Sequence, residues 1–148
     1  MSAPRYLLVD GHSVIFHWPE LRALHARQPN RCREVLARLL GGLHDTSDWL
    51  VTLVFDGKTG TPPLTVTGKM ALIYSQEGQT ADSIIERLVG QVADPATVSV
   101  ITADGAERVT VESLGAVAFS PDWLRDELQR ADSDWQSTLG QVHKKARW

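Results

Sequence analysis

The stretch Tyr6-Leu-Leu-Val-Asp10-Gly11 decides the fold class, because the same pattern recurs twice further along the chain. A short run of apolar, β-forming residues ends in an aspartate followed by glycine, as is typical of a buried strand leaving a sheet. Val51-Thr-Leu-Val-Phe-Asp56-Gly57 and Val100-Ile-Thr-Ala-Asp104-Gly105 repeat it. Segments with helical periodicity lie between these strands, and alternating strands and helices predict a parallel α/β sheet covered on both faces.

The predicted elements divide the chain into one domain over residues 1–130 and a polar tail over residues 131–148. The predicted strands are Tyr6–Val9, Trp49–Phe55, Met70–Tyr74, Val98–Thr102 and Ala116–Phe119. The predicted helices are Val14–Leu24 with a break or start near Pro19, Arg31–Leu43 capped by Asn30, a Thr80-capped helix through about Gln91, Gly105–Leu114, and Pro121–Gln129. The tail is predicted to be either frayed or docked as a helix through Trp135, Leu139 and Val142.

Composition excludes several classes of protein. The chain has 148 residues, 43% of them hydrophobic and 22% charged, which is normal for a soluble domain. No apolar run reaches membrane-spanning length, and no signal peptide precedes the first strand, so we expect a cytoplasmic protein with no membrane partner. The lone Cys32 excludes an internal disulfide and fits a reducing compartment. The net charge of −3 argues against indiscriminate binding of nucleic acid.

Common cofactor motifs are also missing from the sequence. Neither Cys-x-x-Cys nor His-Glu-x-x-His occurs, so a zinc site is not expected. Gly57-Lys58-Thr59 is no phosphate loop, because the earlier glycine of that motif would fall on Thr52. No Gly-x-Gly-x-x-Gly follows the first strand, so a dinucleotide site has no support.

Four aspartates carry the functional prediction. Asp10, Asp56 and Asp104 follow predicted strands, and Asp82 lies in the first turn of a predicted helix. Residues that follow parallel strands gather at one edge of the sheet. Two carboxylates about 4 Å apart repel by roughly 4 kcal/mol at an effective dielectric near 20, so such a group must protonate, separate or hold a cation. Mg²⁺ and Mn²⁺ prefer oxygen ligands, and we therefore predict a site for one of them.

Each aspartate also has a purely structural interpretation. Asp-Gly is frequent in turns, and Asp82 would suit the positive end of a helix dipole. Only the shared edge favours a metal site over these interpretations. Nearby, Ser13 either positions a ligand or caps a helix, and His12 is a candidate contact for substrate. Glu107 and Arg108 are interpreted as an ordinary surface pair, and Glu77 as a solvent-facing loop acid.

The distribution of charge is uneven. Residues 1–69 carry a net charge of +2 and residues 70–148 a net charge of −5. Five arginines fall close together in the first half, and their two interpretations are a phosphate-facing surface and a solvated helix face: Arg22, Arg27, Arg31, Arg33 and Arg38.

Four stretches, taken in order, resemble the YacP-like NYN-domain proteins, a family of PIN-like ribonucleases. Val9-Asp-Gly-His-Ser-Val-Ile15 resembles the family's opening Val-Asp-Gly-Tyr-Asn-Val-Ile, and Val54-Phe-Asp56 its second strand end. Tyr74-Ser-Gln-Glu-Gly-Gln-Thr-Ala-Asp82 resembles Tyr-x-x-Glu-x-x-Thr-Ala-Asp, and Ile101-Thr-Ala-Asp104 resembles Val-Thr-Ser-Asp. The resemblance covers about residues 6–128.

The resemblance implies a three-layer PIN-like fold, a Mg²⁺ or Mn²⁺ centre and cleavage of RNA. By position, Asp10, Asp56, Asp82 and Asp104 match the family's acidic residues. The sequence departs from the family where His12 stands for Tyr, Ser13 for the Asn of the NYN name, and Ala103 for Ser. Because Ser is shorter than Asn and lacks its amide, these departures bear on metal affinity and substrate choice.

The leading hypothesis is a metal-dependent endoribonuclease with RNA as its partner. Asp10, Asp82 and Asp104 would hold an ion that activates water, with Asp56 as ligand or support. Lys58, Lys69 and Arg108 would steer phosphates. The alternative is a non-catalytic module that binds RNA, a protein or the ribosome. A third hypothesis is a phosphohydrolase for small phosphate esters, which would use the same site.

Overall fold

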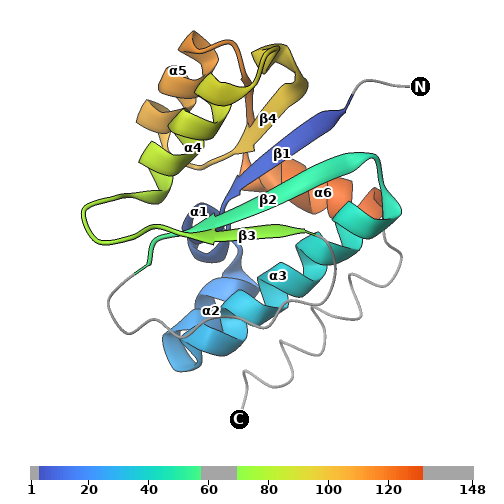
Figure 1. Cartoon of the computed structure of the whole chain (residues 1–148). Helices are drawn as coiled ribbons and strands as arrows, with labels where there is room; N and C mark the ends of the chain where they lie inside the picture. Colours follow the sequence, from blue (N-terminus) through green and yellow to red (C-terminus); the bar gives the residue numbers. More distant parts are fainter. Residues whose placement is uncertain (1–3, 58–69, 132–148) are drawn as a thin grey trace.

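The fold is a three-layer α/β structure built on one parallel sheet (Figure 1). A computed structural model describes residues 4–57 and 70–131 of the chain. The sheet has five strands in the order β3-β2-β1-β4-β5, and every neighbouring pair is parallel. The predicted fold class is confirmed.

The observed elements follow the predicted ones closely. The strands are β1 (Arg5–Asp10), β2 (Trp49–Phe55), β3 (Ala71–Tyr74), β4 (Val98–Ile101) and β5 (Val117–Phe119). The helices are α1 (Gly11–His17), α2 (Pro19–Arg27), α3 (Pro29–Thr46), α4 (Ala81–Gln91), the 3-10 turn η1 (Pro95–Thr97), α5 (Gly105–Ser113) and α6 (Pro121–Ala131). Residues 132–148, which make up nearly all of the predicted tail, lie outside the described part of the chain, so the proposed domain boundary stays a prediction.

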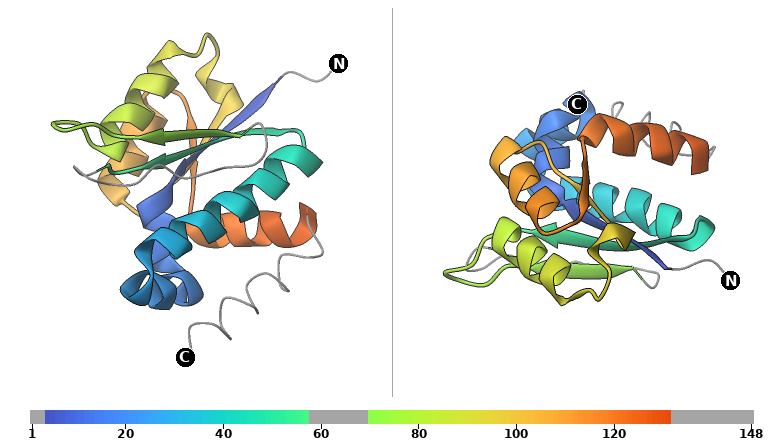
Figure 2. Two further views of the ribbon diagram at one scale, coloured as in Figure 1. Left: turned by 60° about the horizontal axis from the view of Figure 1, so that its bottom comes forward. Right: turned by 90° about the horizontal axis from the view of Figure 1, so that it is seen from above.

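The two faces of the sheet are covered by different helices, as Figure 2 shows. Alternating side chains of β1 point to opposite faces. Leu7 and Val9 pack into one core with the residues of α1, α2, α3 and α6, while Leu8 packs into a second core with α4 and α5. Asp10 continues the alternation from Leu8, so it ends the strand on the side of α4 and α5.

Proline sets two of the helix boundaries. The predicted break near Pro19 is confirmed: the segment after β1 forms two helices, because Pro19 starts α2 and cannot extend α1. Asn30 was wrongly predicted as the cap of α3; the helix begins at Pro29, whose fixed backbone suits a first helical position. Thr80 caps α4 as predicted, since its hydroxyl accepts the Ser83 N–H at 3.0 Å.

Close packing at Gly11 sets the position of α1 under the sheet edge. A methyl group on Gly11 would lie 2.3 Å from Cε1 of Phe55, which is fully buried. No larger residue could start α1 there without displacing that ring. The chain therefore turns from Asp10 directly into α1, and the first turn of the helix stays beside the end of β1.

Hydrogen bonds connect α6 to α2 and to the residue between α1 and α2 within the helical layer formed by α1, α2, α3 and α6. The Trp18 indole N–H donates to the Pro121 carbonyl at 3.0 Å, and the Arg125 guanidinium donates to the Glu20 carboxylate at 3.0 Å. Trp18 is 1% exposed.

Across the described segments, no helix combines the length and the apolar character that crossing a membrane would need.

Candidate metal centre

The predicted acidic edge forms where three neighbouring strands end. β1 is the central strand, with β2 on one side and β4 on the other. Asp10 is the last residue of β1, while Asp56 and Asp104 follow β2 and β4. The winding of the chain reverses between β3 and β4, which places a topological switch point between β1 and β4, where open α/β sheets bind their ligands.

A triad of carboxylates lies at this point. Asp10, Asp82 and Glu107 each offer one carboxylate oxygen, and these oxygens lie within 4.8 Å of one another. The three side chains come from the end of β1, the second residue of α4 and the third residue of α5. Asp10 and Glu107 are buried and Asp82 is half-buried.

Glu107 is the member of the triad that the sequence analysis missed. Its interpretation as a surface residue paired with Arg108 is wrong, since Glu107 is 2% exposed and Arg108 instead pairs with Glu112 at 3.0 Å. The available signal was helical spacing: Glu107 lies one turn before the buried Val111 and therefore on the inward face of α5.

The hydrogen bonds of Glu107 are incomplete. Its Oε2 accepts the Thr102 hydroxyl at 2.7 Å, and that hydroxyl also accepts the Asp104 N–H at 3.0 Å. Its Oε1 is buried, and no hydroxyl or N–H group of the described residues donates to it; the groups beside this carboxylate are the acids Asp10 and Asp82. Buried polar atoms are nearly always satisfied, so an unpaired carboxylate oxygen beside two other carboxylates suggests a missing ligand.

The electrostatics of the triad are those of crowded, desolvated acids. Burial, the hydrogen bond shared with Asp82 and the charges of Asp10 and Asp82 raise the pKa of Glu107 to about 9. Burial also raises the pKa of Asp10, against the opposing effect of its hydrogen bonds to Glu107 and Ser13. Without a cation, the triad therefore keeps at least one proton at neutral pH.

The other two predicted aspartates hold the helices that carry the triad. The Asp104 carboxylate accepts the N–H groups of Ala106 and Glu107 at 2.8 and 3.3 Å, which caps α5. The Asp56 carboxylate accepts the Ala81 N–H at 2.7 Å at the start of α4. Asp104, predicted as a metal ligand, is outside the triad but lines the same pocket.

One pocket of about 420 Å³ brings the predicted residues together. Its described lining includes all four predicted aspartates, Asp10, Asp56, Asp82 and Asp104. The other lining residues are four residues of α1 and one residue that follows β4: His12, Ser13, Phe16, His17 and Ala103. The predicted metal residues and two of the predicted substrate contacts therefore share one cavity.

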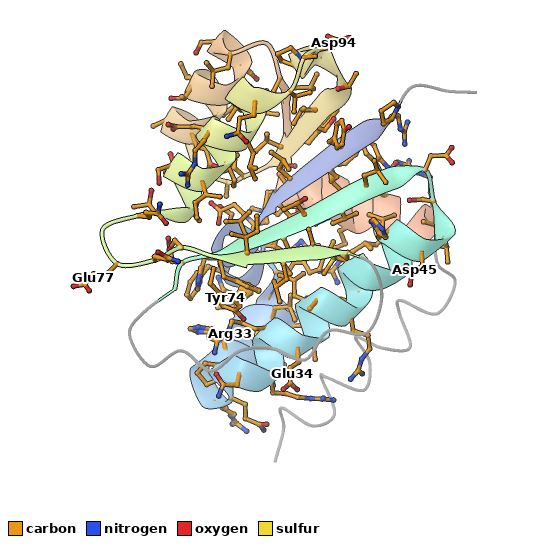
Figure 3. The ribbon with its side chains drawn as sticks, in the orientation of Figure 1. Arg33, Glu34, Asp45, Tyr74, Glu77 and Asp94 are labelled. Carbon is orange, nitrogen blue, oxygen red and sulfur yellow. The ribbon has the colours of Figure 1, made fainter. Side chains whose placement is uncertain are left out.

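Figure 3 shows Glu77 at the tip of the β3–α4 connection, pointing away from the body, as expected of a solvent-facing acid.

The predicted substrate contacts have different surroundings. The Ser13 hydroxyl donates to Oδ2 of Asp10 at 3.1 Å, so it orients a member of the triad. His12 lies between the rings of Phe16 and Phe55. Arg108 lines an adjoining pocket of about 260 Å³, which shares His17, Ala103 and Asp104 with the first pocket. Lys58 and Lys69 lie outside the described residues.

The donor set of the triad fits a hard divalent cation. All three groups are carboxylates, and Mg²⁺ and Mn²⁺ prefer oxygen ligands, whereas zinc sites are usually built from histidine and cysteine. A cation would offset the burial and, to a smaller extent, the repulsion that raise the pKa values of Asp10 and Glu107, and it would offer a partner to Oε1 of Glu107. The triad could therefore hold a metal ion.

Comparisons with known proteins show the family and agree with the fold. Residues 7–148 match the model of the YacP-like NYN domain. The chain is 30% identical over 126 residues to the uncharacterized protein YacP of Bacillus subtilis (strain 168), a match covering 83% of this chain and 74% of that protein. The crystal structure of Rae1 (YacP) from Bacillus subtilis superposes with a TM-score of 0.74 at 26% identity, covering 95% of this chain and 82% of that one. A tryptophan-to-leucine mutant of Rae1 gives a TM-score of 0.74 at 29% identity, covering 85% and 75%.

Proposed function

Because the chain belongs to the YacP-like NYN domain family, we propose that it is a metal-dependent endoribonuclease that hydrolyses RNA phosphodiester bonds. The observation that carries the proposal is the convergence of Asp10, Asp82 and Glu107 at the switch point of the sheet. Buried acids with raised pKa values in a pocket are typical of functional sites, because their arrangement is costly for the fold.

In this proposal Asp10, Asp82 and Glu107 hold one Mg²⁺ or Mn²⁺ ion, and Asp104 is a further candidate ligand. When bound, the ion supplies water activation and neutralises charge on a phosphate under attack. A bound cation would favour the charged form of Glu107, so this side chain would release its proton as the site fills, and the hydrogen bond from Thr102 would help to hold the carboxylate. The Ser13 hydroxyl takes part of the role of the family's Asn by holding Asp10 in place.

The remaining residues position the triad and the RNA. Asp56 and Asp104 fix the first turns of α4 and α5, and through them the side chains of Asp82 and Glu107. Arg108, in the adjoining pocket, is the described candidate for steering a neighbouring phosphate. Lys58 and Lys69 remain candidates for the same task from the sequence alone.

The proposal is tested by cleavage of a 5′-labelled single-stranded RNA with Mn²⁺. We expect Asp10→Asn and Glu107→Gln to reduce the cleavage rate by at least about 100-fold, because each removes a charged ligand while keeping its shape. The matched control is Asp94→Asn, since Asp94 also caps a helical turn, η1, but lies far from the site (Figure 3). This control should cleave like the wild type. Undiminished cleavage by both site variants would exclude the mechanism.

The alternative function is a non-catalytic module that binds RNA or the ribosome. It is favoured by the replacement of the family's Asn by Ser13 and by the proton that the metal-free triad retains. Titration calorimetry with Mn²⁺ separates the two functions. Absence of metal binding, together with retained RNA or ribosome binding, would support the module over the nuclease.

A further inference from the structure

Phe16 is an exposed aromatic ring in the wall of the acidic pocket. Its side chain is 49% exposed, although large apolar side chains are normally placed in the core. It lies on α1, on the same face as His12 and Ser13, and all three line the pocket that Asp10 and Asp82 of the triad also line. Core packing does not account for a ring in this position.

Neighbouring rings hold Phe16 in one orientation. The His25 ring meets it edge-on, with centroids 4.9 Å apart and an interplanar angle of 69°. The His12 ring lies nearly parallel to it at 6.0 Å, and His12 in turn meets the fully buried Phe55 edge-on at 5.6 Å. The exposed part of the Phe16 ring is therefore supported from the core.

The charge of the pocket indicates what this ring could bind. Among the described lining residues there are four aspartates and no lysine or arginine. The lining also holds His12 and His17, but its four aspartates repel phosphate, so a bound metal ion would be the main attraction for an RNA phosphate within this pocket. Uncharged contacts can add affinity there. A nucleobase offers a flat, neutral face, and stacking on an aromatic side chain tolerates any base.

We propose that Phe16 is a stacking platform for an unpaired RNA base next to the phosphate held at the triad. The platform gives the site a preference for single-stranded RNA, since a base within a duplex is stacked on its neighbours and unavailable. The proposal deepens the proposed function, on which it rests for the identity of the ligand.

The test uses Phe16→Ala, Phe16→Leu and Phe16→Trp in the full chain. The probe is a single-stranded 12-nucleotide RNA carrying 2-aminopurine, whose fluorescence is quenched by stacking, with Mg²⁺ present and RNA integrity checked after each titration. We expect Phe16→Ala to weaken binding and raise KM about tenfold, with a smaller effect on kcat. Phe16→Trp should retain the affinity and the quenching, and Phe16→Leu should lose the quenching.

Two controls separate stacking from other effects. Leu50→Ala removes another exposed apolar side chain, which is 42% exposed. Leu50 lies near the start of β2, whereas the pocket lies beyond the end of that strand, so the variant should leave RNA binding unchanged. Raising the salt concentration should leave the ratio of the Phe16→Ala dissociation constant to that of the wild type unchanged, because stacking is not ionic. The loss of affinity caused by Arg108→Ala should become smaller at high salt, because that contact is ionic.

The outcomes distinguish this inference from the proposed function. Equal KM, affinity and quenching for wild type and Phe16→Ala would overturn the platform, even if Glu107→Gln abolished cleavage. A drop in the melting temperature of Phe16→Ala without loss of RNA binding, or an absence of RNA binding by the wild type, would also overturn it. Binding that depends on Phe16 with cleavage that does not depend on Glu107 would support the platform and exclude the proposed mechanism.

Discussion

Glu107 is the residue whose chemistry depends most on its surroundings. In solution a glutamate is charged at neutral pH, but burial and two neighbouring acids raise the pKa of Glu107 to about 9 in the folded protein. The folded state therefore binds more protons than the unfolded state between the ordinary glutamate value and about pH 9. In that range the contribution of Glu107 to the free energy of unfolding of the metal-free protein falls as the pH rises.

This linkage gives a prediction for Glu107→Gln in EDTA. Glutamine cannot ionise, so at pH 8 we expect the variant to be more stable than the wild type by up to about 5 kcal/mol. At pH 3 this difference should be close to zero, because the wild-type glutamate is then protonated in both states. Urea unfolding at several pH values measures the effect. Parallel pH profiles for the two proteins would contradict it.

At the scale of single residues, the sequence allowed only part of the site to be predicted. Asp10 and Asp82 could be identified because their positions after a strand and in a helical first turn are visible in the sequence pattern. The place of Glu107 in the site could not be predicted in the same way, because its burial depends on how α4 and α5 pack against β1. Beside Arg108, it had the appearance of a solvated pair.

At the scale of elements, capping connects the helices to the pocket. We expect Asp104→Ala to destabilise the protein by about 1 kcal/mol, because the N–H groups of Ala106 and Glu107 lose their acceptor. Asp104→Asn should keep the cap and nearly all of the stability. Thermal unfolding of the two variants measures the difference.

Cleavage assays on the same variants separate capping from chemistry. Asp94→Ala removes a comparable cap from η1, so it should cost a similar free energy of unfolding but leave the cleavage rate unchanged. If Asp104→Asn cleaves like the wild type, Asp104 acts only as a cap and is not a ligand.

The sequence predicted the order and type of the elements better than their ends. Strand patterns were sufficient because the apolar runs are short and bounded by turn residues, and Trp49–Phe55 was predicted at its observed bounds. The start of α3 was misplaced because Asn30 is a good cap in isolation, whereas the preceding Pro29 already fits the helix.

For the molecule as a whole, the hydrogen bonds between α6 and the region of α1 and α2 stabilise the helical layer on that face of the sheet. We expect Trp18→Phe to cost about 1–3 kcal/mol, because the buried Pro121 carbonyl would lose its donor. Trp49→Phe is the matched control, since the Trp49 N–H donates to a Glu127 carboxylate that is only partly buried and that water can reach. Denaturant unfolding should therefore show a clearly larger loss for Trp18→Phe than for Trp49→Phe.

The strand order of the sheet was beyond the sequence pattern. Alternation of strands and helices predicts a parallel sheet, but it does not say that the chain returns to the other side of β1 after β3. That return brings Asp10 between Asp56 and Asp104. The sequence analysis expected the aspartates at one edge from parallel strands alone and stated no strand order. The packing of α4 and α5 on one face accounts for the return physically.

The double use of the aspartates affects how related sequences should be interpreted. Asp10, Asp56 and Asp104 each accept N–H groups at the start of a helix, so natural selection for folding alone would preserve them. A homologue that had lost all activity could still carry these three acids. Asp82 and Glu107, for which the described part of the structure shows no such capping bond, are the better markers of a homologue that still performs chemistry.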